Sequence, residues 1–285
     1  MRIAVVGAGT MGHGIAQVAA VAGYQTRLTD ANLSAKDAAL ARVRDNLDGA
    51  VKRSKLSRED ADAALHRLAW LDDLGTAVEG ADLVIEAIVE QLDAKQHLFR
   101  RLDGLLPPGT VLATNTSSLS VSRIAEATGR AERVVGMHFF NPVHIMKLVE
   151  IVTHERAAQE TVGLVSEVAR RMGKDPIVVR DAPGFASSRL GVVLGLEAMR
   201  MVEQRVASPE DIDKAMELGY GHPMGPLRVS DLVGLDVRLA IAEYLFRELR
   251  QPHYEPPAIL RDKVRAGELG KKTGKGFYQW PREPS

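Results

Sequence analysis

The first thirty residues constrain the fold more than any other stretch of the chain. Ile3-Ala4-Val5-Val6 is a short apolar run of the kind that a buried parallel strand needs. Gly7-Ala8-Gly9-Thr10-Met11-Gly12 follows at once, and apolar residues then recur at helical spacing up to Gly23, which can end a helix. A strand, a G-x-G-x-x-G turn and a helix in this order predict the first unit of a doubly wound, Rossmann-type parallel sheet.

The glycine turn also predicts a dinucleotide site. Its glycines permit close approach of a pyrophosphate to the backbone, and the helix N-terminus offers free N–H groups. The residues expected to contact the dinucleotide are Gly7, Gly9, Thr10, Met11 and Gly12. The alternative is that the glycines only shape a tight turn.

An acidic residue follows the turn at the spacing that a dinucleotide site requires. Thr26 to Asp30 reads as a second strand, and Asp30 lies eighteen residues beyond Gly12, where a carboxylate binds the ribose 2′-OH. Asp30 favours NAD over NADP because a carboxylate repels a 2′-phosphate, whereas Arg27 on the same strand favours the opposite. The alternative is that Asp30 only caps the next helix.

Strands and helices continue to alternate up to about residue 180. Further strands are expected at 82–86, 110–113, 134–140, 147–152 and 176–179, and helices at 31–55, 58–65 and 159–172. Proline and glycine interrupt regular structure at Asp181-Ala182-Pro183-Gly184. Beyond this segment only helices are expected, at 190–206, 209–218, 235–249 and 258–266. We therefore predict an NAD-binding Rossmann domain at 1–183 and an all-helical domain at 184–285.

Composition excludes several function classes. The chain has 37 lysines and arginines against 37 aspartates and glutamates, so no net field favours nucleic acid or an anionic membrane. It has no cysteine, which excludes disulfides, thiolate nucleophiles and Cys-ligated metals, and we predict no metal site. No apolar run reaches the length of a membrane span, and the first strand begins at Arg2, which leaves no room for a signal peptide. We expect a cytoplasmic protein.

The middle of the chain carries the pair of residues best suited to catalysis. Asn141-Pro142 interrupts two apolar strands, and a reversal there would bring His138 face to face with Glu150. Glu150 shares a strand face with apolar neighbours, where a carboxylate is costly unless it is paired. A carboxylate would fix the tautomer of the imidazole and make it a general base near neutral pH. The alternative is a structural core histidine beside a carboxylate that borders the sheet.

Small polar side chains follow the strand at 110–113. Thr114 to Ser118 come at the carboxyl edge of the sheet, where ligands bind in open α/β folds, and their side chains are suited to orient a hydroxyl or a carboxamide. The alternative is helix capping by Ser118, Ser120 or Ser122.

Two charged clusters allow more than one interpretation. Glu90 and Lys95 come just after the strand at 82–86, where a charge pair at a helix start is a sufficient explanation. Lys52, Arg53 and Lys55 end the helix expected at 31–55 and are suited to contact the phosphates of an anionic substrate. The alternative is a solvated helix terminus that the helix dipole favours.

Taken together, these motifs resemble the 3-hydroxyacyl-CoA dehydrogenase family in its short, single-function form, which acts on 3-hydroxybutyryl-CoA. The resemblance extends over the whole chain, and its motifs occur in a fixed order. They are Gly7-x-Gly9-x-x-Gly12, Asn115-Thr-Ser-Ser118, His138-Phe-Phe-Asn-Pro142, Lys147-Leu-Val-Glu150, Asp181-Ala-Pro-Gly-Phe185, His222-Pro-Met-Gly-Pro226, Asp231-Leu-Val-Gly-Leu-Asp236 and Lys271-Lys272-Thr-Gly-x-Gly-Phe277.

The resemblance implies NAD-dependent interconversion of a short-chain (S)-3-hydroxyacyl-CoA and the 3-ketoacyl-CoA, in fatty acid and butanoate metabolism. His138 would be the general base, Glu150 its partner and Ser117 the ligand of the substrate's 3-oxygen. The helical domain would close over the acyl chain and form a homodimer. Further implied NAD contacts are Asp30, Glu90, Lys95, Asn115, Asn141 and Lys272.

The resemblance places the CoA phosphates near Lys52, Arg53 and Lys55. One position departs from the family pattern: Ser188 stands before Arg189, where the family commonly has an asparagine. Serine is shorter and has no amide, which alters the expected contact to the substrate carbonyl and the expected acyl-length preference. Two other functions are compatible with the same architecture, namely a dehydrogenase of a small sugar acid such as gulonate, and a non-catalytic, crystallin-like dinucleotide-binding protein.

Overall fold

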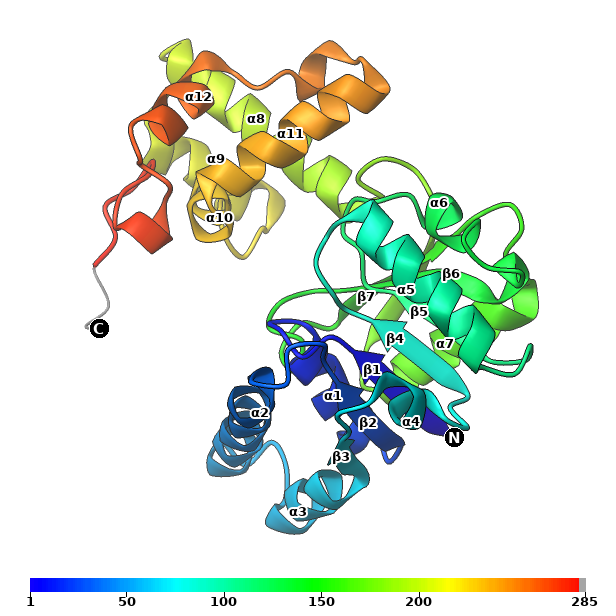
Figure 1. Cartoon of the computed structure of the whole chain (residues 1–285). Helices are drawn as coiled ribbons and strands as arrows, with labels where there is room; N and C mark the ends of the chain where they lie inside the picture. Colours follow the sequence, from blue (N-terminus) through cyan, green and yellow to red (C-terminus); the bar gives the residue numbers. More distant parts are fainter. Residues whose placement is uncertain (282–285) are drawn as a thin grey trace. The chain divides into compact units, whose positions relative to one another are not determined.

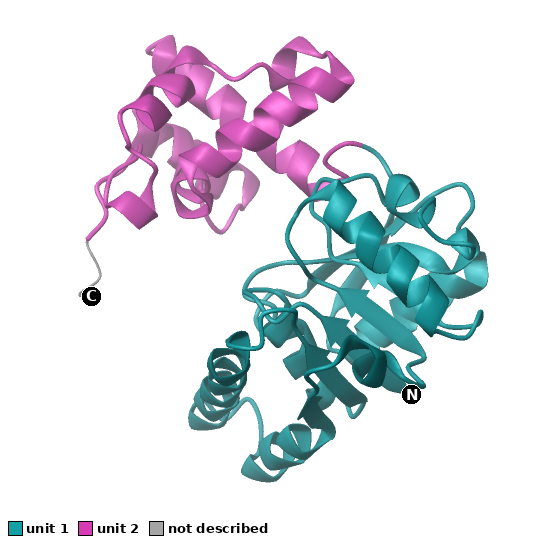
Figure 2. Ribbon diagram, viewed as in Figure 1, with its two compact units in different colours: residues 1–182 teal, residues 183–285 magenta. Residues whose placement is uncertain are grey.

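The computed structural model describes residues 1–281, which divide into two compact units (Figure 2). Unit 1 comprises Met1–Ala182, and unit 2 begins at Pro183. The sequence predicted this boundary one residue later in the chain.

Unit 1 is built on an eight-stranded sheet with the order β3-β2-β1-β4-β5-β6-β7-β8 (Figure 1). Its strands are β1 Arg2–Val6, β2 Gln25–Thr29, β3 Leu68–Trp70, β4 Leu83–Glu86, β5 Val111–Thr114, β6 Val134–Phe139, β7 Leu148–Thr153 and β8 Asp175–Arg180. Every neighbouring pair is parallel except β6 and β7, which pair antiparallel. The predicted doubly wound sheet is confirmed, with its last two strands reversed.

Helices cover both faces of this sheet. They are α1 Gly12–Val21, α2 Ala35–Lys52, α3 Arg58–Arg67, α4 Leu74–Val78, α5 Leu92–Leu105, α6 Val121–Ala125 and α7 Gln159–Arg171. Side chains alternate between the faces, so that Ile3 and Val5 pack in one core with α1 and α7, whereas Ala4 and Val6 pack in another with α5. A strand that is buried on both faces must be apolar throughout, which explains the continuous run at Ile3–Val6.

Unit 2 is helical, as expected. Its helices are α8 Ser187–Glu203, α9 Pro209–Tyr220, α10 Pro226–Val233, α11 Leu235–Leu249 and α12 Ala258–Arg265. Leu196 and Met199 are fully buried in its core, where they serve packing. The sequence did not predict α10, because the side chain that caps it comes from α9: the carboxylate of Asp213 accepts hydrogen bonds from the backbone N–H groups of Leu227 and Arg228, at 2.8 and 2.9 Å.

Within unit 2, a buried carboxylate of α10 binds the C-terminal segment. Asp231 accepts hydrogen bonds from the backbone N–H groups of Phe277 and Tyr278, both at 2.9 Å, and from the indole of Trp280 at 2.8 Å. The two sequence motifs at residues 231–236 and 271–277 are therefore joined by a hydrogen bond. Along the described residues 1–281, none of the helices has both the length and the apolar character needed to cross a bilayer.

Candidate active site

One cavity of unit 1 gathers eight of the site residues that the sequence singled out. Its volume is about 510 Å³, and it lies where β1, β4, β5 and β6 reach their carboxyl ends. Its lining residues are Gly9, Thr10, Met11, Ala87, Ile88, Val89, Glu90, Asn115, Ser117, His138, Phe139, Phe140 and Asn141. This edge of a parallel sheet is where doubly wound folds bind ligands.

His138 and Glu150 meet across the antiparallel pair of β6 and β7. The two residues are direct partners in the register, and His138 Nδ1 lies 2.7 Å from Glu150 Oε2. Glu150 is fully buried, and His138 is 7% exposed at the cavity. An ionised carboxylate only accepts hydrogen bonds, so Nδ1 carries the ring proton and the lone pair of the neutral imidazole is on Nε2. The reversal expected near Asn141 therefore produces the geometry of an oriented base.

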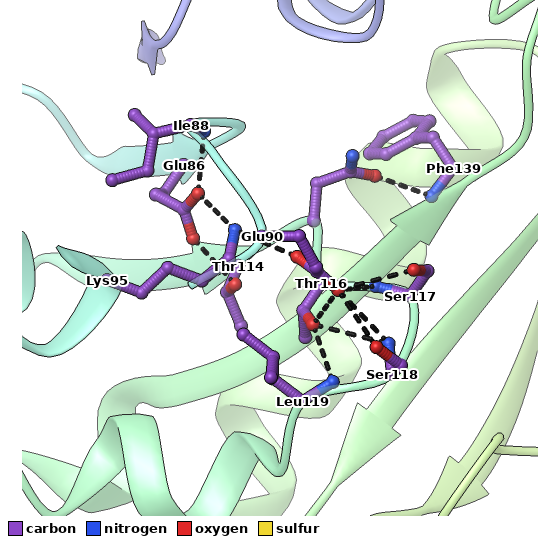
Figure 3. Close-up of polar contacts among 11 residues, drawn as sticks. Glu86, Ile88, Glu90, Lys95, Thr114, Thr116, Ser117, Ser118, Leu119 and Phe139 are labelled. Carbon is purple, nitrogen blue, oxygen red and sulfur yellow. Dashed lines mark hydrogen bonds and ion pairs between the residues drawn. The ribbon is translucent and has the colours of Figure 1, made fainter. Parts of the chain in front are cut away.

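Glu90 holds the turn that presents Ser117 (Figure 3). Its Oε1 accepts hydrogen bonds from Thr116 Oγ1 at 2.6 Å, from the Ser117 N–H at 2.8 Å and from Ser117 Oγ at 3.2 Å. Ser118 adds contacts at 3.2 and 3.4 Å. Ser117 itself is exposed at the cavity, so the carboxylate fixes a hydroxyl that remains accessible to a ligand.

A second carboxylate and a lysine lie behind Glu90 (Figure 3). Lys95 Nζ is 2.5 Å from Glu86 Oε1 and 3.4 Å from Glu90 Oε2, and both Lys95 and Glu86 are fully buried. Burial raises the pKa of Glu86, and the attraction of Lys95 only partly offsets it. Burial alone would also raise the pKa of Glu90, but Lys95 and the hydrogen bonds from Thr116 and Ser117 together hold it below its ordinary value. Lys95 therefore positions Glu90 from a buried site, and its expected direct contact to the cofactor stays a prediction.

One of these network residues, Glu86, was not singled out in the sequence. Glu86 ends a strand that is otherwise apolar, and it also binds Thr114 Oγ1 and the Ile88 N–H, both at 2.7 Å. The signal that identified Glu150, a carboxylate on an apolar strand, was therefore present here as well.

Asn115 ties β5 to β6 beside the cavity. Its Oδ1 accepts the Phe139 N–H at 2.8 Å, next to His138 in the chain. The capping alternative for the serines holds for Ser120, which is the N-cap of α6 and, with Ser122, also binds the carboxylate of Asp181. It does not hold for Ser117, whose hydroxyl contacts Glu90 instead.

In the glycine turn, one glycine is required by packing and another leaves room for a ligand. A Cβ at Gly12 would lie 1.7 Å from the carbonyl oxygen of Gly7, so that position must be glycine for the turn to close. A Cβ at Gly9 would have no neighbour within 4 Å, although Gly9 lines the cavity. Open space at Gly9, at the start of α1, fits a pyrophosphate close to the backbone.

Asp30 lines a different cavity of unit 1, with a volume of about 490 Å³. Its carboxylate accepts hydrogen bonds from the Ala8 N–H at 2.7 Å and from the Asn32 N–H at 2.8 Å. Asp30 therefore stabilises both the glycine turn and the start of the following loop. Arg27 points elsewhere, because its guanidinium binds the carbonyl oxygens of Thr76 and Glu79 at 2.8 and 2.9 Å. The residue that favoured NADP is therefore already engaged.

The remaining candidates lie apart from these cavities. Lys52, Arg53 and Lys55 are exposed at the end of α2 and line neither cavity. Ser188 and Lys272 belong to unit 2. Ser188 is half-buried in the first turn of α8, and the Lys272 ammonium pairs with Asp236 at 2.7 Å.

Comparison with known families matches nearly the whole chain. The sequence model of the 3-hydroxyacyl-CoA dehydrogenase NAD binding domain matches residues 2–182, and that of the 3-hydroxyacyl-CoA dehydrogenase C-terminal domain matches residues 184–280. The two matches meet where unit 1 ends and unit 2 begins.

Individual relatives are similar over their full length or over most of it. A probable 3-hydroxybutyryl-CoA dehydrogenase of Bacillus subtilis is 44% identical over 284 residues, which cover 100% of this chain and 99% of the relative. The crystal structure of (S)-3-hydroxybutyryl-CoA dehydrogenase from Ralstonia eutropha is 39% identical, with a TM-score of 0.94 and 99% of each chain covered. A 3-hydroxyadipyl-CoA dehydrogenase of Escherichia coli is 42% identical over 99% of this chain and 59% of the relative.

Proposed function

The chain belongs to the 3-hydroxyacyl-CoA dehydrogenase family, and on that premise we propose that it interconverts a short-chain (S)-3-hydroxyacyl-CoA and the 3-ketoacyl-CoA with NAD. The single observation that carries the proposal is the His138–Glu150 pair at the wall of a cavity that also contains Ser117 and the glycine turn. A family member that had lost turnover would have no need to keep an oriented base there.

His138 is the proposed general base. In the direction of oxidation its Nε2 takes the proton of the substrate's 3-hydroxyl, and Glu150 stabilises the imidazolium that forms. In the direction of reduction the same nitrogen returns that proton to the 3-oxygen. In this proposal Ser117 Oγ, which donates to Glu90 in the free protein, turns its one hydroxyl proton to that oxygen, while the Ser117 N–H keeps its hydrogen bond to Glu90.

The cavities of unit 1 fit the dinucleotide. Gly9, Thr10 and Met11 provide backbone next to open space, and Glu90, Asn115 and Asn141 place polar groups on the same cavity. Asp30 provides the ribose carboxylate in the neighbouring cavity. NAD, when bound, supplies the hydride-accepting chemistry. Lys272, which the family resemblance also suggests, remains a proposed contact from unit 2.

An assay with two substrates separates the proposed function from its nearest rival. Reduction of acetoacetyl-CoA by NADH should far exceed oxidation of gulonate by NAD, each followed by the absorbance of NADH. The opposite preference would favour the sugar-acid function, and inactivity on both would favour a non-catalytic role. Repeating the assay with 3-ketoacyl-CoA thioesters of increasing length would give the acyl preference. The relatives are named for different acyl groups, so their names do not determine it. In this proposal Ser188 contributes to that preference.

Asp30 should decide the choice between NAD and NADP. Replacing it by asparagine keeps a side-chain oxygen for the Ala8 N–H but removes the charge that repels a 2′-phosphate. We expect the ratio of kcat/KM for NAD to that for NADP to fall by about tenfold or more, the value of one charged hydrogen bond. Asp72→Asn is the matched control, because Asp72 lines the same cavity but accepts the Trp70 indole N–H. An unchanged ratio in Asp30→Asn would remove the ribose assignment.

We also propose a homodimer formed through unit 2. Large apolar side chains are exposed there, including Leu190 at 73%, Leu218 at 84% and Tyr220 at 79%. Exposed apolar groups of this size mark association surfaces in many proteins. Light scattering should give twice the chain mass of 31.0 kDa, and a value equal to one chain would contradict the dimer. We also propose that the protein is cytoplasmic, as the sequence predicted.

A further inference from the structure

A second polar cavity of unit 1 adjoins the candidate active site. Its volume is about 300 Å³, and it shares Thr10 and Asn141 with the first. Two imidazoles and one guanidinium line it against a single carboxylate, and these residues are His13, Arg42, His144 and Asp45. The composition of this wall suits an anion.

The cationic and titratable groups of this cavity are available to a ligand. His13 Nδ1 lies 2.7 Å from the carbonyl oxygen of Gly9 and must carry the ring proton, which leaves Nε2 for another partner. His144 is half-buried in the loop between β6 and β7. Within the described residues, no side-chain hydrogen bond or ion pair involves His144 or Arg42 of α2. Side chains of these types at a cavity wall are suited to bind phosphate oxygens.

The groups around His144 are almost all positive. Burial, followed by the nearby cations Arg53, Lys174 and His13, lowers the pKa of His144. Lys174 is itself buried, and its ammonium binds the carbonyl oxygens of Val143 and Met146, which lie on either side of His144 in the chain. Burial lowers the pKa of Lys174 as well. Among the described residues, Asp45 is the only acidic one that lines this cavity, so the surroundings favour an anionic ligand.

We propose that His13, Arg42 and His144 bind a phosphate group of the CoA substrate, and that His144 takes up a proton when it binds. This inference rests on the proposed function, because a CoA thioester carries a pyrophosphate and a 3′-phosphate at the end remote from its acyl group. Asn141 lies on both cavities, so a substrate whose acyl group reaches His138 has an adjoining site for a phosphate. The dinucleotide also carries a pyrophosphate, and the experiment must distinguish the two sources.

The direction of the pH dependence follows from proton linkage. A bound phosphate stabilises the charged imidazole of His144, so the protonated pocket binds CoA more tightly than the neutral pocket. Affinity is greatest below the pKa of His144 in the free protein and falls as the pH rises toward the higher pKa of His144 in the complex. For His144 the decline begins below the ordinary histidine range, because the pKa of His144 is lowered in the free protein.

The test compares two thioesters that present the same ketone to His138. Acetoacetyl-CoA carries the phosphates and acetoacetyl-pantetheine does not, so the ratio of their kcat/KM values cancels the titration of His138. Measured from about pH 5.5 to about pH 8.5, the wild-type ratio should fall several-fold more steeply than the ratio of the His13→Gln/His144→Gln double variant. Comparison with the variant also removes the ionisation of the substrate's own phosphate, which titrates near pH 6 in both proteins.

Two further variants sharpen the test. Arg42→Gln should lower the ratio by about three- to tenfold at every pH without changing its slope, because a guanidinium stays charged throughout. His66→Gln, in an exposed histidine of α3 that lines neither cavity, should leave the ratio and its slope unchanged. Circular dichroism before the assays would show that each variant is folded.

Each other outcome has a definite meaning. Equal slopes in the wild type and the double variant would overturn the proton-linked phosphate pocket. A change in the KM for NADH, with the thioester ratio unaffected, would assign the pocket to the dinucleotide and overturn its assignment to CoA. Failure of the wild type to reduce either thioester would contradict the proposed function itself, and the CoA assignment would fall with it.

Discussion

Replacing His138 by alanine is expected to lower kcat for the reduction of acetoacetyl-CoA by about a hundred- to ten-thousand-fold, the range that general acid–base catalysis provides. The loss should fall on turnover, because the imidazole is the proposed source and acceptor of the proton at the 3-oxygen. Binding of NADH should stay near the wild-type affinity, since the variant keeps every group that is proposed to bind the dinucleotide.

Steady-state assays and a fluorescence titration of NADH measure the two quantities separately. His154→Gln is the matched control: His154 follows β7 in the same sheet and lies 3.0 Å from the carbonyl oxygen of Val134, away from the three cavities described above. Its turnover should remain within a few-fold of wild type. A His138→Ala enzyme that performs as well as this control would remove His138 from the chemistry.

Replacing Glu150 by glutamine is expected to lower turnover by about a hundred- to a thousand-fold. The amide retains the shape of the carboxylate but can donate to Nδ1, which would place the ring proton on Nε2 and leave no lone pair for the substrate proton. It also removes the negative charge that stabilises the imidazolium. In the direction of oxidation the acid limb of the pH–rate profile should therefore move to lower pH.

The pH profile distinguishes this electrostatic role from a packing role. Glu150 is fully buried, so the variant's stability should be measured as well, by urea unfolding. A stable variant with reduced turnover and an unshifted acid limb would show that the carboxylate orients the ring without tuning its charge. Wild-type turnover together with an unshifted profile would show that the pair is not part of the catalytic machinery.

Local sequence patterns predicted the dinucleotide half of the fold well. The glycine turn and Asp30 lie within one βα unit and the strand that follows it, where the chain itself determines the geometry. The pair of His138 and Glu150 was also predictable, because Asn141-Pro142 forces a break between two apolar strands and the observed antiparallel register joins the two residues. In each case a few consecutive residues contain the information.

Features that depend on distant contacts were missed. The burial of Lys95 between Glu86 and Glu90 depends on how α5 packs on the ends of β4 and β5, which no local pattern shows. The short edge strand β3 and the short helix α4 carry too few residues for a periodic signal.

The cationic cavity escaped notice for the same reason. His13, Arg42 and His144 come from α1, α2 and the loop after β6, and nothing in the local sequence of any one of them indicates the other two. Such a site becomes visible only when the tertiary structure brings its elements together. The predicted phosphate contacts at Lys52, Arg53 and Lys55 were drawn instead from a run of basic residues next to one another in the chain.

The position of the substrate's 3-oxygen relative to His138 tests the central claim most directly. A crystal structure of the protein with NAD and acetoacetyl-CoA would measure the distance from His138 Nε2 to that oxygen. The proposed chemistry predicts about 2.6 to 3.2 Å, with Nδ1 still bound to Glu150 and Ser117 Oγ on the same oxygen. A 3-oxygen bound beyond the reach of the imidazole, with no water between them, would contradict the assignment of His138 as the base.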